Sequence, residues 1–133
     1  MSRLSWLEYG MHLAATASLR SEDPYVQVGC CILRPDNSIA SLGYNGAPPG
    51  VDIDWSNRDD RRKRVIHAET NALRFIKPGE GDRMFVTLMP CSDCLKNAAS
   101  YGINKIFYNK VYDFDTSAKD LAQEFRITLQ QIA

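Results

Sequence analysis

Apolar residues recur at helical spacing near the start of the chain and then give way to strand-like runs. After Ser5, apolar side chains lie mostly three or four positions apart, which predicts an amphipathic helix over residues 5–19 with Ser5 as its N-cap. The β-branched and apolar run 26–33 predicts a strand, and the turn residues 35–38 connect it to a second strand over 39–44. The chain is therefore expected to begin with a helix and a β-hairpin.

The second half of the chain alternates between helical and strand patterns. Residues 45–62 come first; they carry several Gly and Pro and show no sustained period, which predicts a long surface loop. Helices are then expected at 68–75, at 91–101 and from the caps Asp115-Thr116-Ser117 to about 125, and strands at 84–88, 103–108 and 127–132. Such alternation implies parallel pairing and helices on both faces of the sheet. The fold expected for residues 1–133 is a single domain of the α/β class, a three-layer α/β/α arrangement with a mixed five-stranded sheet.

Composition narrows the class of protein. With 133 residues and 44% hydrophobic content, the chain can bury a core without disulfides, so its four cysteines need another explanation. Its 16 basic residues balance 16 acidic ones, which argues against a nucleic-acid partner. We expect no membrane span or signal peptide, because no apolar run is long enough and the first twenty residues are interrupted by polar ones. A cytoplasmic location follows, where thiols stay reduced and nearby cysteines indicate metal binding or catalysis.

Three candidate zinc ligands lie in two clusters, each at the start of a predicted helix. His67 precedes Glu69 by two residues, and Cys91 and Cys94 are three apart after Pro90. Helix N-termini lower the pKa of thiols toward the thiolate that binds metal. Three protein ligands with one open position are typical of catalytic zinc, which brings the pKa of a bound water to about 7. Glu69 is then the candidate that takes the proton of this water and returns it to substrate and leaving amine.

Other interpretations of these motifs stay open at this point. A Cys-x-x-Cys pair alone could be a redox pair or half of a structural zinc site. A noncatalytic zinc module would need a fourth protein ligand and would leave Glu69 without a role. The basic run Arg58–Arg64 is by default a solvated face, with phosphate binding as the alternative.

The two clusters also resemble a known family. The combination His-x-Glu and Pro-Cys-x-x-Cys is the signature of zinc nucleobase deaminases, and segments 67–72 and 87–94 resemble the two zinc motifs of the cytidine and deoxycytidylate deaminase superfamily. Segments 20–24, 28–30 and 43–48 resemble its deoxycytidylate (dCMP) deaminase branch. The resemblance runs from about residue 6 to residue 132.

The resemblance implies a hydrolase that uses one Zn²⁺ to convert dCMP to dUMP and ammonia, which supplies the precursor of thymidylate. Its implied substrate contacts are Asn45 to the deoxyribose, the Ala68 backbone to the pyrimidine, and Arg20, Tyr108 and Lys110 to the 5′-phosphate. The alternatives are another zinc deaminase of the superfamily, acting on adenosine in tRNA or on a free nucleoside, and the noncatalytic zinc module.

Regulation is implied in the same way. Regulated members of the branch are allosteric hexamers that bind dCTP, with Mg²⁺, as activator and dTTP as inhibitor. By this resemblance, the retained residues Gly43, Tyr44 and Gly46 are expected to form part of this second nucleotide site. Some members also hold a second, structural zinc, but residues 47–63 contain no Cys or His, so we do not expect that site.

Overall fold

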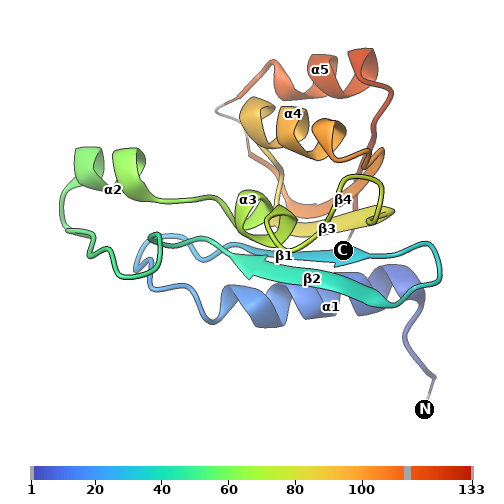
Figure 1. Cartoon of the computed structure of the whole chain (residues 1–133), viewed down its shortest axis with the longest axis horizontal. Coiled ribbons are helices and arrows are strands. Elements are labelled where there is room, and N and C mark those ends of the chain that lie inside the picture. The colour runs from blue at the N-terminus through green and yellow to red at the C-terminus, as the bar shows by residue number, and fades with distance from the viewer. Residues whose placement is uncertain (1, 113–114, 133) are drawn as a thin grey trace.

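The computed structural model describes residues 2–112 and 115–132. Their helices are arranged around one mixed sheet (Figure 1). The helices are α1 (Trp6–Ser18), α2 (Arg58–Arg64), α3 (Ala68–Leu73), α4 (Ser92–Ser100) and α5 (Ala118–Glu124). The strands are β1 (Gly29–Leu33), β2 (Ile39–Tyr44), β3 (Arg83–Leu88), β4 (Lys105–Lys110) and β5 (Thr128–Gln131). Within the described residues, no helix is long and apolar enough to cross a membrane.

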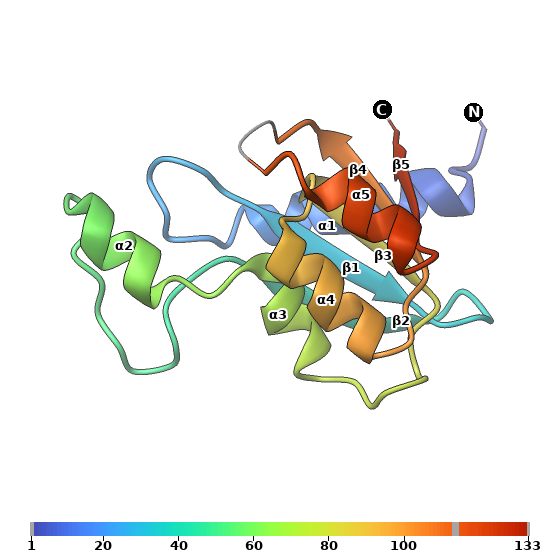
Figure 2. The same cartoon turned by 90° about the horizontal axis from the view of Figure 1, so that it is seen from above.

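The sheet has the order β2-β1-β3-β4-β5. Strand β1 is antiparallel to both of its neighbours, whereas β3, β4 and β5 run parallel. Helix α1 covers one face, and α3, α4 and α5 cover the other (Figures 1 and 2). The predicted three-layer arrangement and five-stranded mixed sheet are thus confirmed.

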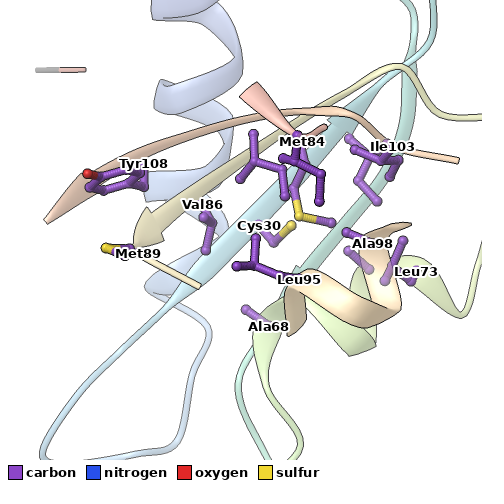
Figure 3. Packing of buried hydrophobic residues seen from close by; sticks show 14 of the residues in the cluster. Cys30, Ala68, Leu73, Met84, Val86, Met89, Leu95, Ala98, Ile103 and Tyr108 are labelled. Atoms are coloured by element: carbon purple, nitrogen blue, oxygen red, sulfur yellow. The ribbon is translucent and has the colours of Figure 1, made fainter. Parts of the chain in front are cut away.

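Strand β1 is buried along its whole length because helices cover both faces of the sheet. Its alternate side chains enter different cores: Cys31 and Leu33 join the cluster under α1, and Cys30 and Ile32 join the larger one under α3 and α4 (Figure 3). At Gly29 the backbone of α1 comes so close that a Cβ would lie 1.8 Å from the Ala14 carbonyl oxygen. Glycine is required there by this close approach.

Helix α1 begins where the sequence predicts. The Ser5 side chain accepts a hydrogen bond from Glu8 N (3.1 Å), and the Glu8 carboxylate accepts one from Ser5 N (2.8 Å). This reciprocal capping box satisfies two N–H groups that the first turn leaves unpaired. The predicted N-cap is confirmed.

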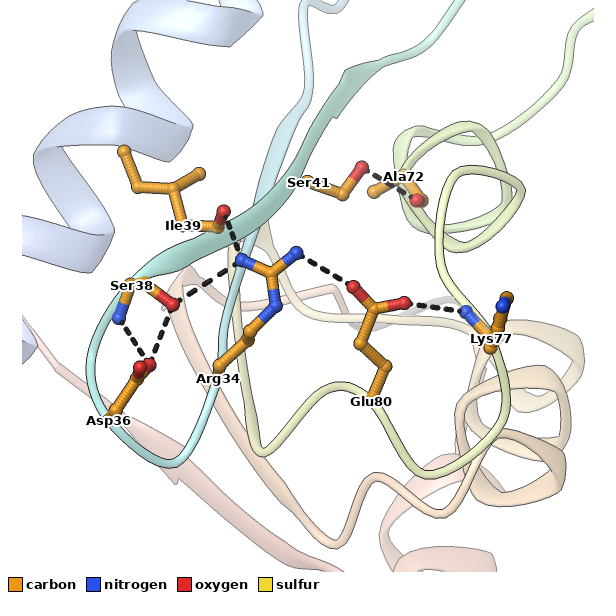
Figure 4. A network of polar contacts seen from close by, with 8 residues as sticks. All are labelled: Arg34, Asp36, Ser38, Ile39, Ser41, Ala72, Lys77 and Glu80. Carbon is orange, nitrogen blue, oxygen red and sulfur yellow. Dashed lines mark hydrogen bonds and ion pairs between the residues drawn. The ribbon is translucent and has the colours of Figure 1, made fainter.

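An arginine network fastens the end of the sheet opposite to the C-terminal end of β3 (Figure 4). Arg34 donates to Ile39 O (2.8 Å) and to Ser38 Oγ (3.3 Å) in the β1–β2 turn. It also pairs with Glu80 (2.7 Å), which accepts a further hydrogen bond from Lys77 N (2.9 Å). The network joins the hairpin to the loop before β3, away from the polar clusters at 67–69 and 91–94.

The structure corrects two sequence predictions for the first half of the chain. The interval 45–62, predicted as a loop, contains most of helix α2, which runs on to Arg64. The first strand begins at Gly29 rather than 26, because Val28 N donates to the Asn45 side chain (2.8 Å) and so leaves the strand ladder.

The residues predicted to cap the last helix do not cap it through their side chains. Ser117 occupies the N-cap position of α5 but makes no side-chain cap hydrogen bond. Asp115 instead accepts hydrogen bonds from Ser92 N (2.7 Å) and Ser92 Oγ (2.8 Å), at the first turn of α4. A carboxylate at this position complements the positive end of α4.

Candidate active site

The site forms where two helices begin at one edge of the sheet. His67 is the N-cap residue of α3, and Cys91 is the N-cap residue of α4, which follows β3. Neither side chain makes a cap hydrogen bond, so both point away from their own helices' backbone donors. His67 is held in place by its neighbour Ile66, which forms a two-hydrogen-bond bridge with Gly46 (2.8 and 3.1 Å).

The donor atoms of His67, Cys91 and Cys94 all lie within 4.8 Å of one another. His67 Nδ1 is 3.2 Å from Cys94 Sγ and 3.6 Å from Cys91 Sγ. Tetrahedral zinc, with bonds of about 2.1 Å to nitrogen and 2.3 Å to sulfur, separates such ligands by about 3.6 Å. The three side chains therefore fit one zinc ion. Within the described part of the chain the group has no fourth His, Cys, Asp or Glu, which leaves one coordination position for a non-protein ligand.

The two thiols are electrostatically unequal. A hydrogen bond from Cys94 lowers the pKa of Cys91 to about 4, with a further contribution from His67. The same hydrogen bond and burial raise the pKa of Cys94. The hydrogen bond to Cys91 raises the pKa of His67. Cys91 is thus a thiolate at neutral pH, in the form that a soft divalent cation binds.

Glu69 lies in the first turn of α3 and is only 3% exposed. Burial raises the pKa of its carboxyl group, and the positive charge of His67 opposes that shift. A carboxyl group in such surroundings exchanges protons at a pH closer to neutrality than an exposed one does. Its position beside the donor group suits a proton carrier.

A cavity of about 380 Å³ opens beside these residues. It is lined by His67, Ala68, Glu69, Cys91 and Asn45, so the structure brings the predicted base and deoxyribose contacts together with the metal group. The volume falls in the range of about 300–1,000 Å³ that is typical of small-molecule sites.

The Asn45 side chain forms hydrogen bonds that order this wall of the cavity. Its Oδ1 accepts a hydrogen bond from Val28 N (2.8 Å), and its Nδ2 donates to Val26 O (3.0 Å) and to Asp23 Oδ2 (3.4 Å). Both amide hydrogens are thereby used, and one lone pair of Oδ1 stays available as an acceptor. Asn45 fixes the 23–28 segment against the end of β2.

The structure does not bring the three predicted phosphate contacts to this cavity. Tyr108 is 5% exposed and packs in the core under α4 and α5. Arg20 lies on the surface after α1, and Lys110 lies on the surface at the end of β4. None of the three lines the cavity, and their contact with a phosphate stays a prediction.

The predicted allosteric residues border a second hollow, of about 540 Å³. Gly43, Tyr44 and Gly46 line it together with Arg74 and Asp52. Gly43 also has a packing role, because a Cβ there would lie 2.5 Å from Ala72 N in α3. Gly46 has no atom within 4 Å of its Cβ position.

One wall of the first cavity comes from the basic run Arg58–Arg64, for which the sequence favours a solvated face, with phosphate binding as the alternative. Arg58, Arg61 and Arg62 of α2 line it, as does Tyr25. The sequence signal was the basic run, whose spacing of three and four residues would place these arginines on one side of a helix. The run contains no apolar residues, so hydrophobic periodicity does not predict a helix there and the solvated face is the simpler interpretation.

Comparison with known proteins agrees with this geometry. Residues 4–110 match the model of the cytidine and deoxycytidylate deaminase zinc-binding region. Human deoxycytidylate deaminase is 34% identical over 142 residues, covering 96% of this chain and 80% of its own length. ComE operon protein 2 of Bacillus subtilis is also 34% identical, covering 99% of this chain and 74% of its own length. The dCMP deaminase of cyanophage S-TIM5, in complex with dCMP and dUMP, superposes with a TM-score of 0.81 at 26% identity, covering 99% of this chain and 100% of that one. The chain belongs to the cytidine and deoxycytidylate deaminase family, whose fold it shares.

Proposed function

We propose that this protein catalyses the zinc-dependent hydrolytic deamination of dCMP to dUMP and ammonia. The observation that carries the proposal is the convergence of His67, Cys91 and Cys94 beside the buried Glu69 at one end of a cavity. The human relative is a deoxycytidylate deaminase, and the cyanophage relative binds dCMP and dUMP, which supports this substrate.

His67, Cys91 and Cys94 would hold the zinc ion, which when bound supplies a water molecule acidified toward a pKa of about 7. Glu69 accepts the proton of the attacking water on a carboxylate oxygen and delivers it to N3 of the cytosine ring. Glu69 then accepts the proton of the hydroxyl group that has been added at C4 and delivers it to the amino group, which leaves as ammonia while C4 becomes the carbonyl carbon of dUMP. Water adds to C4 and the C4–N4 bond breaks, so dCMP and water become dUMP and ammonia.

The walls of the cavity orient the substrate for this step. The N–H of Ala68, in the first turn of α3, is available to the pyrimidine because the first N–H groups of a helix have no intrahelical partner. The remaining lone pair on Asn45 Oδ1 accepts a hydroxyl of the deoxyribose. Leu88 and Met89 supply apolar surface for the base. Fixed contacts of this kind hold C4 in a reactive position.

We also propose that the second hollow binds regulatory nucleotides, with dCTP and Mg²⁺ activating, dTTP inhibiting, and the enzyme working as a homo-oligomer, a hexamer by resemblance. Arg74 offers a positive charge to a triphosphate, and Asp52 offers oxygen ligands of the kind that Mg²⁺ prefers. Sigmoidal dCMP saturation should become hyperbolic with dCTP, and dTTP should reverse that shift. Hyperbolic saturation that neither triphosphate alters, in a protein that sediments as a monomer, would refute this regulation.

A cytoplasmic location accords with the chemistry of the site. All four cysteines are free thiols, and two of them belong to the metal group. A reducing compartment keeps such thiols available as ligands.

The activity is tested by ammonia release from dCMP, deoxycytidine, CMP and dCTP, and from a tRNA with an unpaired adenosine. The account predicts that dCMP has the largest kcat/KM. Turnover of the tRNA alone would assign the chain to base editing. Zinc binding without turnover of any substrate would support a noncatalytic module.

A further inference from the structure

Helix α2 stands apart from the rest of the molecule (Figures 1 and 2). None of its seven residues is buried. Its form is held locally, because the Asn57 side chain accepts a hydrogen bond from Asp60 N (3.1 Å) and Asp60 pairs with Arg64. The helix therefore contributes little to the hydrophobic core, and core packing does not explain its position.

One side of α2 forms part of the active-site cavity. Arg58, Arg61 and Arg62 line it, at the i, i+3 and i+4 positions that share a helix face. Among the ion pairs of the described residues, α2 takes part only in the internal Asp60–Arg64 pair, so none of the three cavity arginines is in an ion pair there. The wall thus carries three guanidinium groups, none of which forms an ion pair with a carboxylate of the described residues.

The cavity wall also contains Asp23, whose carboxylate oxygens are already hydrogen-bonded to other groups. Asp23 Oδ1 accepts hydrogen bonds from Tyr25 N (2.8 Å) and Val26 N (3.2 Å), and Oδ2 accepts one from Asn45 Nδ2 (3.4 Å). Its charge organises the 23–28 segment. The guanidinium groups of Arg58, Arg61 and Arg62 are consequently able to bind an anionic ligand in the cavity.

Arg61 is also oriented. Its guanidinium lies over the Tyr25 ring, 4.0 Å from the centroid. Stacking occupies the flat face of the guanidinium and leaves the N–H groups at its edge free to donate. Tyr25 belongs to a segment that is fastened to the end of β2, since Ser21 Oγ donates to Asn45 O (2.8 Å). The contact thus links the projecting helix to the 21–28 segment, which also lines the cavity.

We infer that Arg58, Arg61 and Arg62 bind the 5′-phosphate of the substrate, with Arg61 as the oriented member of the set. The inference rests on the proposed function and names the specificity determinant of the same site. The fork of a guanidinium matches two phosphate oxygens, and such charge-assisted hydrogen bonds are the strong ones. A nucleoside without phosphate leaves the three arginines unpaired, so the site selects nucleoside 5′-monophosphates. The base end of the ligand then lies at Glu69 and the phosphate end at α2.

The test compares dCMP with deoxycytidine as substrates of the zinc-loaded full chain. Arg61→Ala should lower the ratio of kcat/KM for dCMP to that for deoxycytidine by about tenfold to a hundredfold, as expected for a lost hydrogen bond to a charged group. Arg61→Lys, which keeps the charge but not the fork, should restore part of the ratio. Lys63→Ala is the matched control: it removes one charge from the same helix at a position that does not line the cavity, and should leave the ratio unchanged. All three variants should keep the wild-type Tm because α2 has no buried residue.

Calorimetric titration with dUMP and deoxyuridine separates this inference from the proposed function. Loss of dUMP affinity in Arg61→Ala, with deoxyuridine affinity retained, supports the phosphate site even if turnover of dCMP is absent. An unchanged ratio in Arg61→Ala, an equal loss in Lys63→Ala, or a loss confined to Arg20→Ala or Lys110→Ala would overturn it while leaving dCMP deamination intact.

Discussion

A single methyl group at Gly43 should disturb both the fold and the chemistry. Strand β2 passes under α3 at this residue, where an added Cβ would lie 2.5 Å from Ala72 N and 2.7 Å from Ala68 O. Both neighbours are backbone atoms of α3, so no side chain can rotate away to make room. Reaching ordinary contact at 3.4 Å requires α3 to move from the sheet by about 0.9 Å.

Two magnitudes follow from this displacement in Gly43→Ala. Overpacking a well-packed contact typically costs about 1–3 kcal/mol of unfolding free energy, so Tm should fall by several degrees. Helix α3 also carries Ala68 and Glu69 in its first turn, with His67 as its N-cap. A misplacement of about 1 Å at reacting groups can reduce the rate about 10²-fold.

The assay measures Tm and kcat/KM for dCMP on Gly43→Ala at equal zinc content. Gly46→Ala is the control for stability, because nothing lies within 4 Å of a Cβ at that position, and its Tm should match the wild type. A Gly43→Ala protein with wild-type Tm and kcat/KM within threefold of wild type would refute the argument from close approach.

Three further predictions concern the metal group, α4 and the far end of the sheet. The wild type should bind about one zinc ion per chain with one non-protein ligand, and Cys94→Ser should lose most of the bound zinc. Metal analysis and zinc-edge absorption measure this, and a zinc ion with four protein ligands would contradict the prediction. The pKa of Asp115 is lowered to about 2 by the hydrogen bond from Ser92 N, so its stabilising effect is present above the ordinary value of 3.8 and is lost as the pH falls toward 2. Asp115→Asn should therefore make urea stability fall less steeply between pH 4 and 2 than in the wild type, and an equal slope would show that the carboxylate does not act this way. Arg34→Met removes the hairpin network, so Tm should fall while KM for dCMP stays within twofold; a changed KM would show that this end of the sheet couples to the site.

The layered fold was predictable because short stretches of the sequence show the hydrophobic patterns of its strands and helices. The apolar run before residue 33 is nearly continuous, as expected for a strand with both faces covered, and the structure buries all of β1. Helix α2 was not predictable in this way. Its sequence of five basic and two acidic residues has no apolar period, and the local interactions that hold it, the Asn57 cap and the Asp60–Arg64 pair, are too weak a signal to predict a helix within a loop rich in Gly and Pro.

The metal group was predictable for the same reason, since its ligands are N-cap and first-turn residues of two helices. The cavity wall opposite it depends on long-range contacts instead. Asn45 and Tyr25 both line it because the hydrogen-bonded 23–28 segment lies along the end of β2, and Arg61 stacks on Tyr25 although the two are 36 positions apart in the chain. No local pattern in the sequence carries that information.

The most direct test of the account follows the loss of cytosine absorbance as dCMP becomes dUMP, with wild type and Glu69→Gln at equal zinc content. Glutamine keeps the size of the side chain but cannot accept the proton of the attacking water, and loss of general acid–base catalysis typically costs about 10²–10⁴-fold. The account predicts efficient turnover of dCMP by the wild type and a Glu69→Gln variant that binds zinc, folds, and has kcat lower by at least 10²-fold. A variant that keeps more than about a tenth of wild-type kcat would contradict the role of Glu69 as the proton carrier.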